Sequence, residues 1–161
     1  MKHRGDETMK VHIRLAKASD YDEIMEILNQ VHALHVKLRP DLYQESHDLL
    51  TLEELKDDIS HQGYYVAKED GKVVGILRIM FRHIKTPAHQ ECRIIWIDTM
   101  GVADGYRGKG IGHQLLCYVK TLKEQLGYDR IELQVNAQNQ HAYDIYKQYG
   151  FVDKSIIMEL S

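Results

Sequence analysis

Two periods of apolar residues run along this sequence and predict most of its elements. Alternation of apolar and polar residues, as at Val11, Ile13 and Leu15, is typical of half-buried strands, whereas apolar residues at steps of three and four are typical of amphipathic helices. Strands are therefore expected at residues 11–15, 64–67, 73–81, 92–102 and 131–135, with last strand material at 151–152 and 156–158, and helices at 20–38, 52–62, 111–126 and 137–149.

Capping residues mark where the helices begin. Ser19 is a suitable N-cap for the first helix, and Thr51 with Glu54 forms a capping-box pair for the second. Gly75, inside an apolar strand, indicates a bulge or close packing. The order is strand, two helices, three strands, then alternating helix and strand. It predicts an α/β fold with a mixed, mostly antiparallel sheet and helices on both faces.

Composition narrows the class of protein without naming a function. The 161 residues fit a single domain, which we expect at 10–161 after a flexible N-terminal extension at 1–9. A net charge of −3 carries no basic signature for nucleic acid, and no apolar run is long enough for a membrane span. Cys92 and Cys117 suggest no disulfide framework, so a reducing cytoplasm is the simplest compartment.

The ten histidines are many for this length but are scattered. His32 and His35 lie three residues apart on an expected helix, which is compatible with a shared metal ion. Solvated or hydrogen-bonded helix histidines are the more ordinary interpretation, and no compact ligand motif such as HExxH occurs. We therefore expect no metal. The apolar residues of the loop at 41–50 indicate that it folds over something, either an acceptor pocket or ordinary packing.

The stretch from Trp96 to Gly112 has the pattern of an anion-binding turn. An apolar strand leads into Gly108, Gly110 and Gly112, and an amphipathic helix follows at once. Glycines let the backbone approach a ligand closely, and the unpaired N–H groups of a helix start point at it. Arg107 and Lys109 add positive charge at the same place.

Two common phosphate-binding motifs do not match this turn, because each lacks specific residues that it requires. A P-loop beginning at Gly105 would need lysine and a hydroxyl residue after Gly110, where the chain has Ile111 and Gly112. A dinucleotide-binding GxGxxG beginning at Gly108 would need a third glycine at His113. Neither a nucleoside triphosphate nor a dinucleotide is therefore favoured.

Two other motifs are present together, and they carry a resemblance to a known family. The run 107–112, RGKGIG, matches [Q/R]xxGx[G/A], and Asn139, Ala142, Tyr146, Gly150 and Phe151 match NxxAxxxYxxxGF. The chain resembles the GNAT superfamily of acyl-CoA-dependent N-acetyltransferases, specifically over about 96–151. One departure is Asp104, where many relatives carry proline. The resemblance implies a fold in which the strand ending at 102 splays from the next strand.

The resemblance also implies the cosubstrate, acetyl-CoA, and the residues that contact it. Backbone N–H groups around Gly108 to Gly112 would bind the pyrophosphate, and the pantetheine would lie along Met100 to Val102, where one N–H would polarise the thioester carbonyl. Tyr146 would protonate the departing thiolate. The full expected set of cofactor contacts is Met100, Gly101, Val102, Arg107, Gly108, Lys109, Gly110, Ile111, Gly112, Asn139, Ala142 and Tyr146. For Asn139 a helix-cap role and for Tyr146 a core role stay open.

The acceptor is expected to be a primary amine of a small molecule or a peptide, attacking the thioester directly. Asp98, on an otherwise apolar strand, is the first candidate for the base or water relay, with structural hydrogen bonding as the alternative; Glu91 and Glu132 are weaker candidates. Trp96 either lines the acceptor pocket or belongs to the core. Dimers are common among relatives, so a homodimer is compatible. A non-catalytic acyl-CoA sensor on the same fold is the alternative function.

Overall fold

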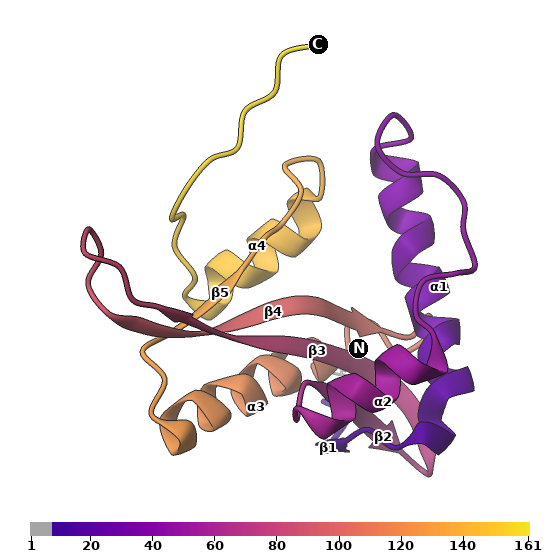
Figure 1. Cartoon of the computed structure of the whole chain (residues 1–161). Helices are drawn as coiled ribbons and strands as arrows, with labels where there is room; N and C mark the ends of the chain where they lie inside the picture. Colours follow the sequence, from indigo (N-terminus) through magenta and orange to yellow (C-terminus); the bar gives the residue numbers. More distant parts are fainter. Residues whose placement is uncertain (1–7) are drawn as a thin grey trace, which may run out of the picture.

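The structure, a computed structural model, describes residues 8–161 and contains a five-stranded sheet in the order β1-β2-β3-β4-β5 (Figure 1). The elements are β1 (His12–Leu15), the 3-10 turn η1 (Ala18–Asp20), α1 (Tyr21–Leu38), α2 (Leu52–Ser60), β2 (Tyr64–Glu69), β3 (Lys72–Ile84), β4 (Cys92–Val102), α3 (Ile111–Leu126), β5 (Arg130–Leu133) and α4 (Gln140–Tyr149). Strands β1 to β4 pair antiparallel, and β5 pairs parallel to β4. The predicted α/β fold with a mixed, mostly antiparallel sheet is confirmed.

The sheet has a helix layer on each face, and each layer has its own apolar core. On one face α3 packs against β2, β3 and β4 through Leu115 and Val119, which are fully buried. On the other face α1 and α2 cover the sheet through Ile24, Ile27 and Leu55. Within residues 8–161, no helix combines the length and apolarity needed to cross a membrane.

Two bulges interrupt the ladder. One lies beside Gly75, where a Cβ would meet Ile111 of α3 at 3.1 Å, so both the bulge and the close packing expected there are found. The other lies on β4, where Arg78 pairs with Thr99 but Ile79 pairs with Ile97, leaving Asp98 as the extra residue. An extra residue moves every later side chain to the opposite face of the sheet.

The start of the first helix differs from the prediction. A 3-10 turn precedes α1, and the N-cap is Asp20 rather than Ser19. The Asp20 carboxylate does not cap α1, because it is buried and accepts hydrogen bonds from the Arg14 guanidinium and the Lys17 N–H. The capping box of Thr51 and Glu54 forms as predicted.

The last predicted strand is absent. Residues 151–161 form neither helix nor strand, and the apolar side chains that follow Phe151 are exposed. The apolar residues at 156–158 have strand propensity, but a strand needs a partner edge, and within the described chain this segment has none. The strand predicted at 131–135 also ends earlier, at Leu133.

Gly101 sets the distance between α1 and β4 and provides a test of this packing. A Cβ at Gly101 would lie 2.6 Å from Cγ2 of Val31 and 3.4 Å from Cγ2 of Ile27. Because these β-branched side chains have little rotamer freedom, Gly101→Ala should lower the free energy of unfolding by about 1–3 kcal/mol in urea denaturation. Gly112→Ala is the control, since its Cβ meets open space in α3; it should match or exceed the native stability. An unchanged midpoint for Gly101→Ala would contradict this account.

Candidate active site

Strand β4 continues beyond the end of its neighbour β5. The two strands pair from Ile94 with Arg130 to Ile97 with Leu133, and β4 then runs on to Val102. The edge of β4 from Thr99 to Val102 that faces away from β3 therefore has no strand beside it among the described residues. The splay implied by the resemblance would lie here, where the pairing of β4 with β5 ends.

The backbone of Val102 faces this unpaired edge. On one side Ala103 N–H donates to the Val74 carbonyl of β3 at 2.9 Å, and on the other the Val102 carbonyl accepts from Nε of Arg107 at 3.2 Å. Consecutive residues of a strand direct their backbone groups to opposite edges. The N–H and C=O groups of Met100 and Val102 therefore point to the open edge, and those of Gly101 point to β3.

The turn after β4 combines left-handed glycines with an uncapped helix start. Gly105, Gly108 and Gly110 have φ values of 84°, 75° and 79°, which side chains with a Cβ rarely adopt. Gly110 is the N-cap of α3 and supplies no side chain to the first N–H groups, and the first turn of α3 holds no acidic residue. The positive end of a 16-residue helix is thus left open to an anion.

The cationic side chains around this turn contact neighbouring groups of the protein. Arg107 forms an ion pair with Asp104 at 3.0 Å, in addition to its bond to Val102. Nζ of Lys109 lies 5.8 Å from the centre of the Tyr106 ring, and Nζ of Lys72 lies 5.7 Å from the same ring. Lys72 is a third cation that the sequence reasoning missed, because only the pairing of β3 with β4 brings it to this turn.

Gln114 is a second residue that the motifs did not reveal. Its Nε2 donates to the Met9 carbonyl at 2.6 Å and to the Gly110 carbonyl at 3.3 Å, and its Oε1 accepts from Val11 N–H. Met9 N–H also donates to the Lys109 carbonyl. The segment before β1, which the sequence assigns to the N-terminal extension as far as residue 9, is thereby tied to the glycine turn; residues 1–7 lie outside the described part.

Helix α4 carries the predicted acid. Tyr146 packs edge-on against Phe151, with ring centres 5.7 Å apart, and joins the core on the α3 face. Burial raises the pKa of the Tyr146 hydroxyl above its ordinary value. The hydroxyl is therefore protonated at neutral pH, which is the state that a proton donor needs.

Asn139 is the N-cap of α4. Its Oδ1 accepts the N–H of Ala142 at 3.3 Å, so the helix-cap role left open by the sequence is the one the structure displays. Ala142 and Tyr146 follow on the same side of the helix at steps of three and four. Any coenzyme contact of Asn139 must come from the atoms that capping leaves free.

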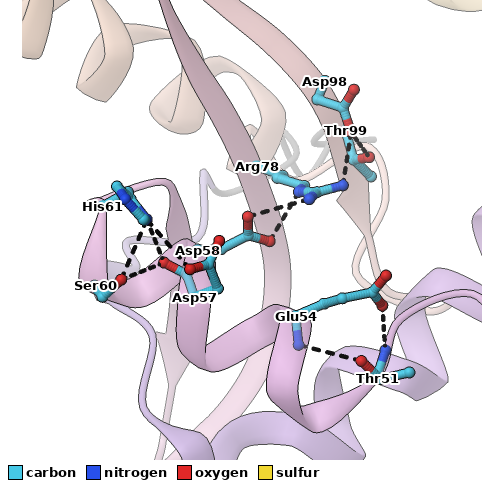
Figure 2. A network of polar contacts seen from close by, with 9 residues as sticks. All are labelled: Thr51, Glu54, Asp57, Asp58, Ser60, His61, Arg78, Asp98 and Thr99. Atoms are coloured by element: carbon cyan, nitrogen blue, oxygen red, sulfur yellow. Dashed lines mark hydrogen bonds and ion pairs between the residues drawn. The ribbon is translucent and has the colours of Figure 1, made fainter.

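Asp98 lies at the β4 bulge in a network with Arg78, Asp58 and Thr99 (Figure 2). Its Oδ2 lies 3.4 Å from Nη1 of Arg78 and accepts from the Thr99 hydroxyl at 3.3 Å. Asp58 of α2 binds the same guanidinium, through a hydrogen bond from Nη2 at 3.1 Å and an ionic contact from Nε at 2.9 Å whose angle is poor for a hydrogen bond. The shared arginine orients Asp98 toward the α1 and α2 face of the sheet.

The other residues considered for the acceptor side of the site lie apart from Asp98 or beside Arg82. The Trp96 ring is half-buried, and the Arg82 guanidinium lies over it, 4.0 Å from the ring centre. Because residues 78 and 82 of β3 share a face of the sheet, Trp96 lies on the same face as Arg78. Glu91 bonds to His83 at 2.8 Å near the far end of the β3-β4 hairpin, and Glu132 pairs with Lys154. Neither glutamate shares the network of Asp98.

The loop at 41–50 folds back on α1. The ring of Tyr43 lies 6.3 Å from that of His32 and 5.4 Å from that of His35, and Nε2 of His32 is 2.7 Å from the Gln44 carbonyl. Burial, with a smaller contribution from His32, lowers the pKa of His35. Across residues 8–161, no group of three or more His, Cys, Asp or Glu side chains is placed to hold a metal ion.

A surface depression of about 290 Å³ lies elsewhere, lined in part by His61, Phe81 and Tyr128. It contains none of the predicted site residues and lies toward the end of the sheet where β4 and β5 are paired. The candidate active site is therefore the open edge of β4 together with the glycine turn, and not this depression.

Comparison with known proteins agrees with this arrangement. A model of the acetyltransferase (GNAT) family matches residues 24–151. S-alkylcysteine N-acetyltransferase of Bacillus subtilis (strain 168) is 27% identical over 143 residues, which cover 86% of this chain and 76% of that protein. N-alpha-acetyltransferase of Sulfurisphaera tokodaii is 28% identical over 149 residues, covering 90% and 82%.

Solved structures give the same result. A mutant of the BH1408 protein from Bacillus halodurans superimposes with a TM-score of 0.89 at 25% identity, covering 93% of this chain and 98% of that one. The enzyme AAC(6')-Iy, in complex with a bisubstrate analogue of CoA, superimposes with a TM-score of 0.69 over 95% and 98% of the two chains, and at 14% identity this likeness concerns the fold alone. With the family model spanning most of its length and relatives that are N-acetyltransferases, this chain belongs to the acetyltransferase (GNAT) family.

Proposed function

We propose that this protein transfers an acetyl group from acetyl-CoA to a primary amine. The observation that carries the proposal is the continuity of the open edge of β4 with the glycine turn at the start of α3. An extended pantetheine pairs with the first, and a pyrophosphate is bound by the second. The N-acetyltransferase relatives support the reaction class.

The chemistry begins with the amine. A primary amine with a pKa near 10.4 is neutral in only about one molecule in a thousand at pH 7.4. Asp98 attracts the ammonium form and passes its proton to water, because a carboxylate is too weak a base to hold it. The amine then attacks the thioester carbonyl directly, forming the C–N bond. An N–H at the open edge of β4 stabilises the oxyanion.

Collapse of the tetrahedral intermediate breaks the C–S bond, and the hydroxyl of Tyr146 donates its proton to the departing thiolate. A thiol has a pKa near 8.5 and an ordinary tyrosine near 10, so this transfer is uphill by at least about 2 kcal/mol. That is a small part of the barrier of an enzymatic reaction, and water restores the tyrosine proton. Neither cysteine is assigned a role in this reaction: Cys92 is buried, and Sγ of Cys117 accepts a hydrogen bond from the Tyr149 hydroxyl.

The acceptor enters from the α1 and α2 side of the sheet. Asp98, Arg78 and the Tyr43 loop lie on this side, and the α1 residues Ile27 and Val31 approach Gly101 there. The relatives act on an S-alkylcysteine and on N-alpha amines, as their names state, which supports an amino-acid or peptide amine as acceptor. We place the reaction in the cytoplasm, in keeping with two unpaired cysteines.

Gly112→Glu tests the pyrophosphate assignment with the fold left intact. A Cβ at Gly112 meets open space in the first turn of α3, where a negative side chain stabilises the helix. The same charge repels phosphates, so the affinity for acetyl-CoA measured by calorimetry should fall by about tenfold or more, or about 1.4 kcal/mol. Gly112→Ala should bind normally. Full binding by Gly112→Glu would remove this turn as the pyrophosphate site.

Tyr146→Phe tests the acid. Loss of the proton donor should lower kcat by about 10²-fold or more with little change in acetyl-CoA affinity. Tyr149→Phe, three residues along α4, is the matched control and should keep kcat, because its hydroxyl contacts Cys117. The acid must be protonated and its pKa is raised, so native activity should rise with pH as the amine deprotonates and show no decline from Tyr146 below about pH 10. A Tyr146→Phe enzyme of native rate would exclude the role.

Asp98→Asn tests the acceptor side. The amide keeps the shape at the bulge but loses the charge that attracts the ammonium, so kcat/KM for the amine should fall by about 10²-fold while acetyl-CoA affinity stays constant. Glu91→Gln is the control and should change neither parameter. A panel of amines measured by coenzyme release provides the assay. Acetyl-CoA binding without turnover on any amine would favour a sensor over an enzyme.

A further inference from the structure

The face of the sheet that carries Asp98 also carries an arginine without a counter-charge. Arg78, on this face of β3, is held between Asp58 and Asp98. Arg82 lies on the same face and is exposed, and among residues 8–161 no carboxylate forms an ion pair with it. The charge of Arg78 is therefore compensated within the protein, whereas that of Arg82 is available to a ligand.

Trp96 holds the Arg82 guanidinium in one place. The guanidinium lies over the indole, 4.0 Å from the ring centre. Stacking uses the flat face of a guanidinium and leaves the N–H groups at its edge able to donate two parallel hydrogen bonds to a carboxylate. Within the described part of the chain, no other protein group accepts from these N–H groups. A guanidinium that is already held in place loses less conformational freedom when it binds an anion.

The carboxylate beside Trp96 on β5 has a partner of its own. Glu132 is the register partner of Trp96 and shares its face of the sheet, but it forms an ion pair with Lys154. Arg130, two residues earlier on β5, lies on that face too and adds a second positive charge. This part of the face therefore favours an anionic group.

Asp98 and the stacked arginine are spaced for a ligand that carries both charges. Asp98 follows Trp96 by two residues, about 7 Å along a strand, and its carboxylate lies on the face of Arg78 (Figure 2). In an α-amino acid, two covalent bonds separate the nitrogen from the carboxyl carbon. With a charge-assisted hydrogen bond of about 2.8 Å at each end, such a molecule reaches from one site to the other.

We propose that the acceptor is a free α-amino acid, whose ammonium group binds Asp98 and whose carboxylate binds the Arg82 guanidinium on Trp96. The inference rests on the proposed acetyl transfer and narrows its acceptor, because a peptide N-terminus has an uncharged amide in place of that carboxylate. Met80, the register partner of Trp96, is 43% exposed and provides apolar surface beside the acceptor. Arg82 thus determines specificity without contacting the reacting atoms.

The single tryptophan of the chain gives a binding assay that needs no turnover. Trp96 fluorescence, measured with and without CoA, should change on titration with members of a panel of non-aromatic L-α-amino acids that includes methionine and S-methylcysteine. The matching carboxamides keep the amine and the shape but lose the negative charge, so they should bind about tenfold more weakly or worse. Carboxamides that bind as tightly as the acids, or a panel that binds nowhere, would overturn the proposal.

Arg82→Gln shows whether this arginine is responsible. The affinity for the amino acid should fall by about 10- to 100-fold and that for its carboxamide should stay constant, because only the anion loses a partner. Arg82→Lys keeps the charge without the paired hydrogen bonds and should be intermediate. Arg93→Gln is the matched control, since Arg93 also stacks on a ring, 4.4 Å from the centre of Tyr128, but belongs to the opposite face. Equal losses for acid and carboxamide in Arg82→Gln would contradict the assignment.

Coenzyme release separates this inference from the proposed reaction. With the amino acid as acceptor, Arg82→Gln should raise KM by the same factor as it weakens binding and leave kcat nearly constant. Carboxylate-dependent binding without turnover would contradict the acetyl transfer and support the acceptor site. Turnover of carboxamides and peptides as efficient as that of free amino acids would support the acetyl transfer and overturn the acceptor site.

Discussion

The candidate site depends on one feature of the sheet: β4 is longer than the neighbouring β5, so part of its edge has no partner strand. Backbone N–H and C=O groups that lose their partner need another one, because an unpaired buried polar group costs about 1–3 kcal/mol. Where β5 ends at Leu133 and β4 continues to Val102, the sheet keeps a row of such groups at its middle rather than at its rim. An extended ligand with amides of its own can pair with them, as a strand does.

The bulge at Asp98 decides which side chains at the unpaired end of β4 lie on each face of the sheet. Without it, Ile97, Thr99 and Gly101 would share one face, and Met100 would lie on the other. The extra residue instead places Met100 and Val102 with Ile97 on the α3 side and lets Gly101 meet α1. It also turns a carboxylate toward Arg78 on the α1 and α2 side. One irregularity thus separates the side of β4 that we propose for the coenzyme from the side that we propose for the acceptor.

The anion site that we propose consists mainly of backbone groups. Arg107 is shared between Asp104 and the Val102 carbonyl, and Lys72 and Lys109 lie over the ring of Tyr106. These cations create a positive potential around the turn, and the uncapped N–H groups of α3 can donate directed hydrogen bonds to an anion. Gln114 and Met9 form hydrogen bonds with this turn, in which Gly108 and Gly110 have left-handed conformations.

The sequence by itself determined what depends on local conformation: the helices and most strands, the capping box at Thr51, and the left-handed glycine turn before α3, because these follow from neighbouring residues. It also placed Tyr146 and Asn139 on one helix. Tertiary structure decided where distant residues meet. The pairing of Asp98 with Arg78 and Asp58 depends on a bulge that leaves no trace in composition, and Lys72 reaches Tyr106 only through the β3-β4 ladder. The final strand was predicted from propensity and is absent among the described residues, because a strand also needs a neighbouring edge with which to pair.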